Sequence, residues 1–170
     1  MDALLIVDML KDFIEPGAPL EVPQASDIVP NIKREIAKAR ACGAPVIYIN
    51  DAHRDDDPEF CVWPRHAVRG TDGAKVVEEI APLEGDPVIE KTSYSGFFGT
   101  DLEARLRTLG AKKLTITGVV TNICILYTAA DALMRGFEVE IPEDCVAALN
   151  DEDHRFALKQ IKSVLKPRQV

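Results

Sequence analysis

Three residues with complementary chemistry, Asp8, Lys91 and Cys124, each stand at or just after a run of apolar residues. Together they supply an acid–base group, a cation and a nucleophile, which are the parts that thiolate catalysis needs. A neighbouring cation lowers the pKa of a thiol, and a carboxylate can accept its proton and return it to a leaving group. Taken singly, each has the simpler structural explanation, because free cysteine is commonly buried for packing alone.

The local setting of Cys124 favours a reactive thiol. Residues 113–117 alternate and are rich in β-branched side chains, as expected of a strand, and residues 123–134 follow a helical pattern. Either Thr121 or Asn122 can cap this helix. At such a strand-to-helix turn, backbone N–H groups point outward and the helix dipole favours a thiolate.

A second group of side chains has the composition of a metal site. Asp51 and His53 are separated by one residue, and His66 follows thirteen residues later. Their oxygen and imidazole donors suit zinc, iron or manganese. From the spacing alone, a solvated acidic loop with incidental histidines is an equally good interpretation of these residues.

The elements that would position these residues alternate along the chain. Strand-like runs at 3–8, 45–50, 87–91, 113–118 and 137–142 alternate with helix-like runs at 26–41, 73–80, 100–110, 123–134 and 151–165. This alternation is typical of a parallel α/β sheet, and the nearly continuous apolar strands indicate helices on both faces. Thr100 and Glu103 form a capping box at the start of one helix. Because ligands bind beyond the carboxyl ends of parallel strands, the candidate residues are predicted to share one edge of the sheet.

Length and composition limit the classes of function. A chain of 170 residues predicts one domain, residues 1–170, and 46% hydrophobic with 28% charged residues is typical of a globular protein. The net charge of −8 argues against nucleic acid and against an anionic membrane surface, which leaves small-molecule chemistry. The first apolar run, which ends at Asp8, is too short for a signal peptide or a membrane span, so we expect a cytoplasmic protein. Without a CxxC pair, Cys42, Cys61 and Cys145 are expected to be reduced and to have no catalytic role.

Three motifs in order, "LLIVDMLKDF", "EKTSYSGFFGTDL" and "TGVVTNICILYTAADALMRGF", extend over nearly the whole chain. They resemble the isochorismatase-like cysteine hydrolases, in particular the nicotinamidase/pyrazinamidase branch. The resemblance implies an α/β fold of three αβα layers with a mostly parallel, six-stranded sheet. It implies the triad Asp8, Lys91 and Cys124. It also implies a cis peptide between Val119 and Val120, and an oxyanion hole made by the N–H groups of Val120 and Cys124.

The resemblance extends to a divalent metal, with zinc as the first choice and iron or manganese as alternatives. Asp51, His53 and His66 would bind it, and Glu59, seven residues before His66, holds the position of a further ligand in some nicotinamidases. In those enzymes the metal holds the pyridine nitrogen of nicotinamide and leaves the carboxamide carbon facing the thiol.

Aromatic walls for the substrate ring are expected from Phe13, Trp63 and Tyr94, although aromatic side chains are often buried for packing alone. The implied reaction converts nicotinamide to nicotinate and ammonia through a cysteine thioester, as part of pyridine nucleotide salvage. A homo-oligomer with a small-molecule amide substrate is also implied by the resemblance. His154 is expected to be a surface residue without a role.

One departure leaves the substrate open. Asn122 stands where many nicotinamidases have Asp, a choice also common in relatives that act on other amides. The alternatives are therefore a cysteine amidase for a carbamoyl or ureido compound and, from a different class, a non-catalytic binding protein on the same fold.

Overall fold

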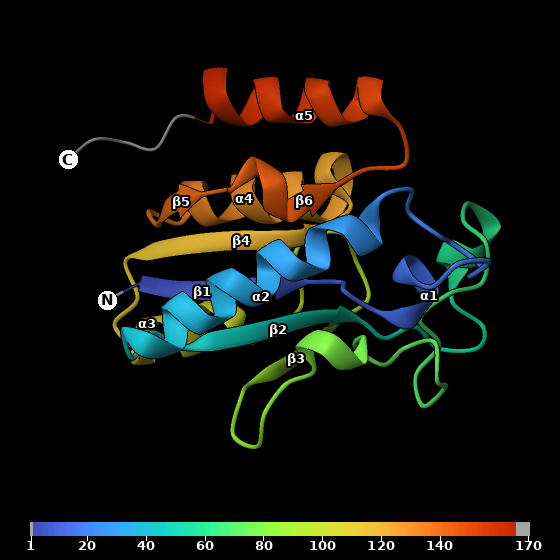
Figure 1. Ribbon diagram of the computed structural model, residues 1–170, viewed down its shortest axis with the longest axis horizontal. Helices are drawn as coiled ribbons and strands as arrows, with labels where there is room; N and C mark the ends of the chain where they lie inside the picture. Colours follow the sequence, from blue (N-terminus) through green and yellow to red (C-terminus); the bar gives the residue numbers. More distant parts are fainter. Residues whose placement is uncertain (1, 166–170) are drawn as a thin grey trace.

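The structure is a computed structural model that describes residues 2–165. Its centre is a six-stranded parallel sheet in the order β3-β2-β1-β4-β5, with β6 paired to β4 (Figure 1). The strands are β1 (Asp2–Val7), β2 (Val46–Asp51), β3 (Val88–Lys91), β4 (Lys113–Val119), β5 (Glu138–Glu140) and β6 (Val146–Ala147). The predicted fold class and strand number are confirmed.

Helices cover both faces of the sheet, with α2 in front of it and α3 behind it in the view of Figure 1. The α-helices are α1 (Lys11–Ile14), α2 (Ala25–Ala41), α3 (Leu102–Thr108), α4 (Leu126–Met134) and α5 (Asp151–Ser163). Short 3-10 turns are η1 (Pro58–Cys61), η2 (Glu78–Ile80) and η4 (Glu143–Cys145), and η3 (Thr121–Ile125) is one π-helical turn. Within residues 2–165, no helix has the length and apolar character needed to cross a membrane.

Alternate side chains of the central strands enter two separate hydrophobic clusters. On β1, Leu4 and Ile6 pack with the buried face of α2, whereas Leu5 and Val7 pack with α3 and α4. Because both faces of β1 are covered, its residues from Ala3 to Val7 are all buried. This packing on both faces fixes the position of the strand ends that carry the reactive side chains.

Tertiary contacts override two of the predicted helix starts. Residues 73–80 form only the turn η2, because Gly73 and Lys75 give their carbonyl oxygens to N–H groups of the segment that follows β1. The capping box at Thr100 is only half formed: α3 begins at Leu102 and the Thr100 hydroxyl accepts the Leu102 N–H at 3.3 Å, but the Glu103 carboxylate pairs with Arg107 and Arg135. The sequence patterns located the right regions but not these boundaries.

Glycine is required where β4 ends beside β1. Gly118 pairs with Val7 and has φ +114°, and a Cβ placed on it would lie 2.0 Å from the Val7 carbonyl oxygen. Only a residue without a side chain allows the two backbones to approach this closely. The close approach brings the segment leading to Cys124 next to the residue after Val7, which is Asp8.

We predict that Gly118→Ala lowers the free energy of unfolding by about 3 kcal/mol, because the new methyl group forces β4 away from β1. Gly110→Ala is the matched control: Gly110 also has a positive φ, +67°, but its Cβ would meet no atom within 4 Å. The control should lose only about 1 kcal/mol from backbone strain. Urea unfolding of both variants measures the difference, and equal losses would contradict the close-approach argument.

Candidate active site

The ammonium group of Lys91 lies at the centre of the site. It is fully buried and contacts three acceptors: Asp8 Oδ2 at 2.8 Å, Asp51 Oδ1 at 2.5 Å and the Cys124 sulfur at 3.4 Å. These residues come from the carboxyl ends of β1, β2 and β3 and from the turn after β4, as the sequence predicted for one edge of the sheet. The structure therefore brings together a carboxylate, a cation and a thiol.

Two hydrogen bonds to the backbone of β2 hold Asp8 in place. Its N–H donates to the Ile49 carbonyl, and its Oδ1 accepts the N–H of Asp51 at 2.7 Å. The residue has φ +52°, a left-handed conformation that Asp adopts more readily than most side chains. As a result, the second carboxylate oxygen, Oδ2, points toward the Lys91 ammonium.

Burial and charge set the protonation of the reactive groups. Burial, and then the Asp51 charge, raise the pKa of Asp8 to about 6, although Lys91 opposes this shift. Burial also raises the pKa of the Cys124 thiol well above its usual value despite the nearby Lys91. For Lys91 itself, burial lowers the pKa, but Asp51 and Asp8 outweigh it and hold the pKa well above its ordinary value. The resting thiol is thus protonated, and the Asp8 carboxylate is placed to act as its base.

Cys124 lies in the π-helical turn η3, directly after a cis peptide bond between Val119 and Val120. Neither Thr121 nor Asn122 caps this helix. Instead, the buried Thr121 hydroxyl lies 2.9 Å from Nδ1 of His154 on α5, so His154, expected to be a surface residue without a role, is half-buried and contacts the turn that carries Cys124. The proposed oxyanion hole at the N–H groups of Val120 and Cys124 remains a prediction.

Two imidazoles and a carboxylate converge beside the Lys91 cluster. The Nε2 atoms of His53 and His66 lie 3.7 and 3.8 Å from Asp51 Oδ2. All three side chains are buried, their ligand atoms lie within 4.8 Å of one another, and His53 Nε2 has no hydrogen-bond partner within residues 2–165. This buried, unpartnered nitrogen and the nitrogen–oxygen donor set fit a divalent metal ion.

Contacts on the far side of each imidazole orient both rings. His66 Nδ1 lies 2.7 Å from the carbonyl oxygen of Pro64, which can only accept, so Nδ1 carries the proton and Nε2 has a free lone pair in the neutral ring. His53 Nδ1 faces the carboxylate of Asp57 at 3.1 Å. Partners of this kind fix the tautomer of a metal-ligating histidine. Sequence analysis missed Asp57, although its position four residues after His53 in an acidic run was a visible signal.

Glu59 lies at the edge of this group. Its carboxylate clusters with His53 and Asp57, whereas the compact set that faces Asp51 contains only the two histidines. Burial and the charge of Asp51 raise the pKa of Glu59. Its role as a further ligand remains a prediction.

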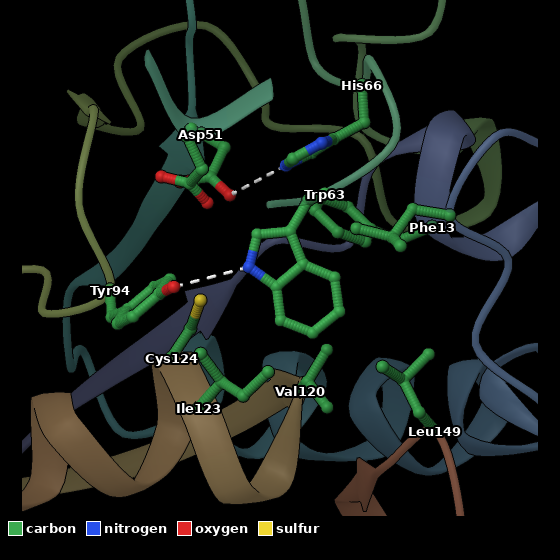
Figure 2. A pocket seen from close by; sticks show the side chains of 11 residues that line it. Phe13, Asp51, Trp63, His66, Tyr94, Val120, Ile123, Cys124 and Leu149 are labelled. Atoms are coloured by element: carbon green, nitrogen blue, oxygen red, sulfur yellow. Dashed lines mark hydrogen bonds and ion pairs between the residues drawn. The ribbon is translucent and has the colours of Figure 1, made fainter. Parts of the chain in front are cut away.

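A narrow pocket opens above the thiol (Figure 2). It is lined by Phe13, Leu20, Asp51, Glu59, Trp63, His66, Tyr94, Val120, Ile123, Cys124 and Leu149. The Trp63 indole N–H donates to the Tyr94 hydroxyl at 3.2 Å, and the Phe13 ring meets the His66 ring edge-on at 5.2 Å. The three aromatic residues expected as walls therefore all line the pocket.

Three aliphatic residues of the wall were not anticipated: Leu20, Ile123 and Leu149. Leu20 and Leu149 come from loops far apart in the sequence, and no local pattern marks such residues as lining a site. Ile123 is next to Cys124 and falls within the helical pattern, where it reads as an ordinary core residue. Figure 2 shows Ile123 and Val120 on the side of the pocket that carries the Cys124 sulfur.

Comparison with known proteins identifies the family. Residues 2–168 match the model of the Isochorismatase domain. The structure of a pyrazinamidase from Pyrococcus horikoshii in complex with zinc superposes with a TM-score of 0.89 at 39% identity, covering 95% of this chain and 94% of that one. An N-carbamoylsarcosine amidase from Thermoplasma acidophilum gives a TM-score of 0.88 at 40% identity, covering 96% and 92%. A Bacillus subtilis isochorismatase family protein, YaaI, is 34% identical, with 96% of this chain and 90% of the relative aligned.

The fold and the comparisons define the protein as an α/β cysteine amidohydrolase. It belongs to the isochorismatase family. The names of its relatives specify different amides, a pyrazine carboxamide in one and a carbamoyl amino acid in another, so family membership alone does not select the substrate.

We predict that Lys91→Met lowers the free energy of unfolding by about 3–5 kcal/mol, because it leaves two buried carboxylates without their cation. Lys75→Met is the matched control, since Lys75 is mostly exposed and pairs only with the exposed Asp72. The control should unfold within experimental error of the wild type. Denaturant unfolding of the purified variants provides the comparison, and a Lys91 variant as stable as the control would refute the buried-charge account.

Proposed function

We propose that the protein hydrolyses nicotinamide to nicotinate and ammonia through a thioester on Cys124. The observation that carries this proposal is the placement of His66 in the lining of the pocket that contains the thiol and three aromatic side chains, with His53 and Asp51 beside it. Aromatic walls suit a flat heteroaromatic amide, because its ring can lie between them while its two polar ends reach the two sides.

The charges of the pocket support an uncharged substrate. None of the described residues that line it is a lysine or arginine, and two of them, Asp51 and Glu59, are acidic. N-carbamoylsarcosine, the substrate in the name of one relative, carries a carboxylate, for which the described lining offers no lysine or arginine side chain. Lys91 does not serve this purpose, because Asp8 and Asp51 already neutralise it. Nicotinamide carries no such charge, which favours it over a carbamoyl amino acid.

Asp51, His53 and His66 would hold a divalent metal, with zinc as the first choice, iron or manganese as alternatives, and Glu59 as a further ligand. When bound, such an ion supplies an open Lewis-acid position for the pyridine nitrogen. Phe13, Trp63 and Tyr94 would flank the ring, with the carboxamide directed toward Cys124.

The chemical steps use groups already in contact. Asp8 accepts the thiol proton while the Cys124 sulfur attacks the carboxamide carbon, and Lys91 stabilises the negative charge that the two groups share. The N–H groups of Val120 and Cys124 would stabilise the oxyanion, a contribution of about 3 kcal/mol per donor in comparable sites. Asp8 then returns the proton to the departing ammonia, leaving an acyl thioester. Water hydrolyses the thioester, with Asp8 accepting its proton and Cys124 regaining it.

We predict that Cys124→Ala reduces ammonia release from nicotinamide by roughly 10⁴-fold or more, since no other group can form the thioester. Cys145→Ala is the matched control, because Cys145 is equally buried but lies in the cluster beneath α2. The control should retain most of the activity. A Cys124 variant that turns over at a tenth of the wild-type rate would disprove covalent catalysis by this thiol.

We predict that His66→Ala lowers kcat/KM for nicotinamide by roughly 100-fold or more, because the donor set loses one of its two imidazoles. Removal of metal by a chelator should have the same effect on the wild type. Benzamide lacks the ring nitrogen and should be a poor substrate before and after chelation.

Ammonia release with nicotinamide, benzamide and N-carbamoylsarcosine, combined with elemental analysis of the purified protein, provides the test. Nicotinamide should be the preferred substrate, and metal should be present in stoichiometric amount. Equal turnover of nicotinamide and benzamide, or preference for N-carbamoylsarcosine, would overturn the assignment.

A further inference from the structure

The backbone of Ala67 connects the two histidines of the proposed metal site. Ala67 directly follows His66, and its carbonyl oxygen accepts the backbone N–H of His53 at 3.0 Å. The residue has φ +45°, a left-handed conformation that an alanine adopts only when its surroundings impose it. The placement of both imidazoles therefore depends on how the backbone of this one residue is held.

The side chain of Asp12 holds the backbone of Ala67 in place. Asp12 Oδ2 accepts the N–H of Ala67 at 2.8 Å. A carboxylate is a stronger acceptor for a backbone N–H than a neutral oxygen, because the hydrogen bond is assisted by charge. No step proposed for the reaction uses Asp12, and it does not line the pocket.

The position of Asp12 is itself fixed by its neighbours. Its N–H donates to the Gly73 carbonyl at 3.0 Å, and its own carbonyl accepts the N–H of Leu20 at 3.2 Å. The carboxylate lies against the bare face of Gly73, where a Cβ would come within 2.0 Å of Asp12 Oδ1. Any side chain at position 73 would therefore displace the group that holds Ala67.

We propose that Asp12 is a positioning residue for the metal site, acting through the Ala67 peptide on both His53 and His66. This inference rests on the metal site of the proposed function. Asp12 lies on α1, four residues after Asp8, and its neighbour Phe13 packs its ring against His66. The short helix α1 thus fixes the histidines relative to the catalytic strand end of β1.

The proposal is tested by cobalt(II) titration of the metal-free protein, which gives a dissociation constant and a visible absorption spectrum of the bound ion. Asp12→Ala should raise the dissociation constant 10–100-fold, the range seen when outer partners of metal ligands are removed. Gly73→Ala should shift it in the same direction, because the new methyl group displaces the carboxylate although Asp12 itself is unchanged. Asp12→Asn retains an acceptor oxygen and should bind cobalt within about threefold of the wild type.

Asp72→Ala is the matched control. Asp72 is an exposed acid next to Gly73 that pairs with Lys11 and Lys75 and does not contact Ala67. It should bind cobalt as the wild type does, which separates the hydrogen bond to Ala67 from a general loss of negative charge.

Each result decides the question. If Asp12→Ala or, where that variant does not fold, Gly73→Ala binds cobalt within twofold of the wild type with an unchanged spectrum, the positioning role is wrong. If Asp12→Asn is as weak as Asp12→Ala, the hydrogen bond to Ala67 is not the cause and the proposal also fails. A wild type that takes up no cobalt would overturn the metal site of the proposed function first, and the role of Asp12 with it.

Discussion

The ion cluster around Lys91 is the constraint on which the rest of the site depends. A lysine buried among apolar strands is tolerated only if opposite charges compensate for its lost hydration. Two carboxylates do so, Asp8 at 2.8 Å and Asp51 at 2.5 Å, and they can reach the ammonium because β1, β2 and β3 are adjacent parallel strands that end at one level. The register of β2 and β3 therefore places Asp51 beside Lys91, since the two residues pair directly across the sheet.

One carboxylate links the chemistry to the site for the ring. Asp51 gives Oδ1 to Lys91, while its Oδ2 faces the imidazoles of His53 and His66. Asp51 therefore ties the proposed metal site to the Lys91 cluster through one buried side chain at the end of β2, while His53 and His66 come from the segment that follows. This arrangement suits an enzyme that must present one carbon atom of a small planar molecule to a sulfur, because small displacements of reacting atoms are costly in rate.

Much of this could be predicted from sequence, because parallel strands align their carboxyl ends and place Asp8, Lys91 and Cys124 together whatever the details of the helices. Strand β6 escaped notice, since its two residues carry no periodic signal. The helix expected at 73–80 was lost because its backbone groups bond to the segment after β1 instead. The contact between Thr121 and His154 depends on how separate segments meet, and only the fold reveals it.

The central claim is that amide cleavage passes through an acyl thioester on Cys124, and partitioning of the products by hydroxylamine tests it most directly. Turnover of nicotinamide is followed with and without this second nucleophile, and both nicotinate and nicotinohydroxamate are quantified. A thioester intermediate predicts that hydroxamate appears at the expense of nicotinate as hydroxylamine increases, with one ammonia released for each acyl group whichever product forms. Nicotinate as the sole product at every hydroxylamine concentration would indicate direct attack by water and would contradict the account.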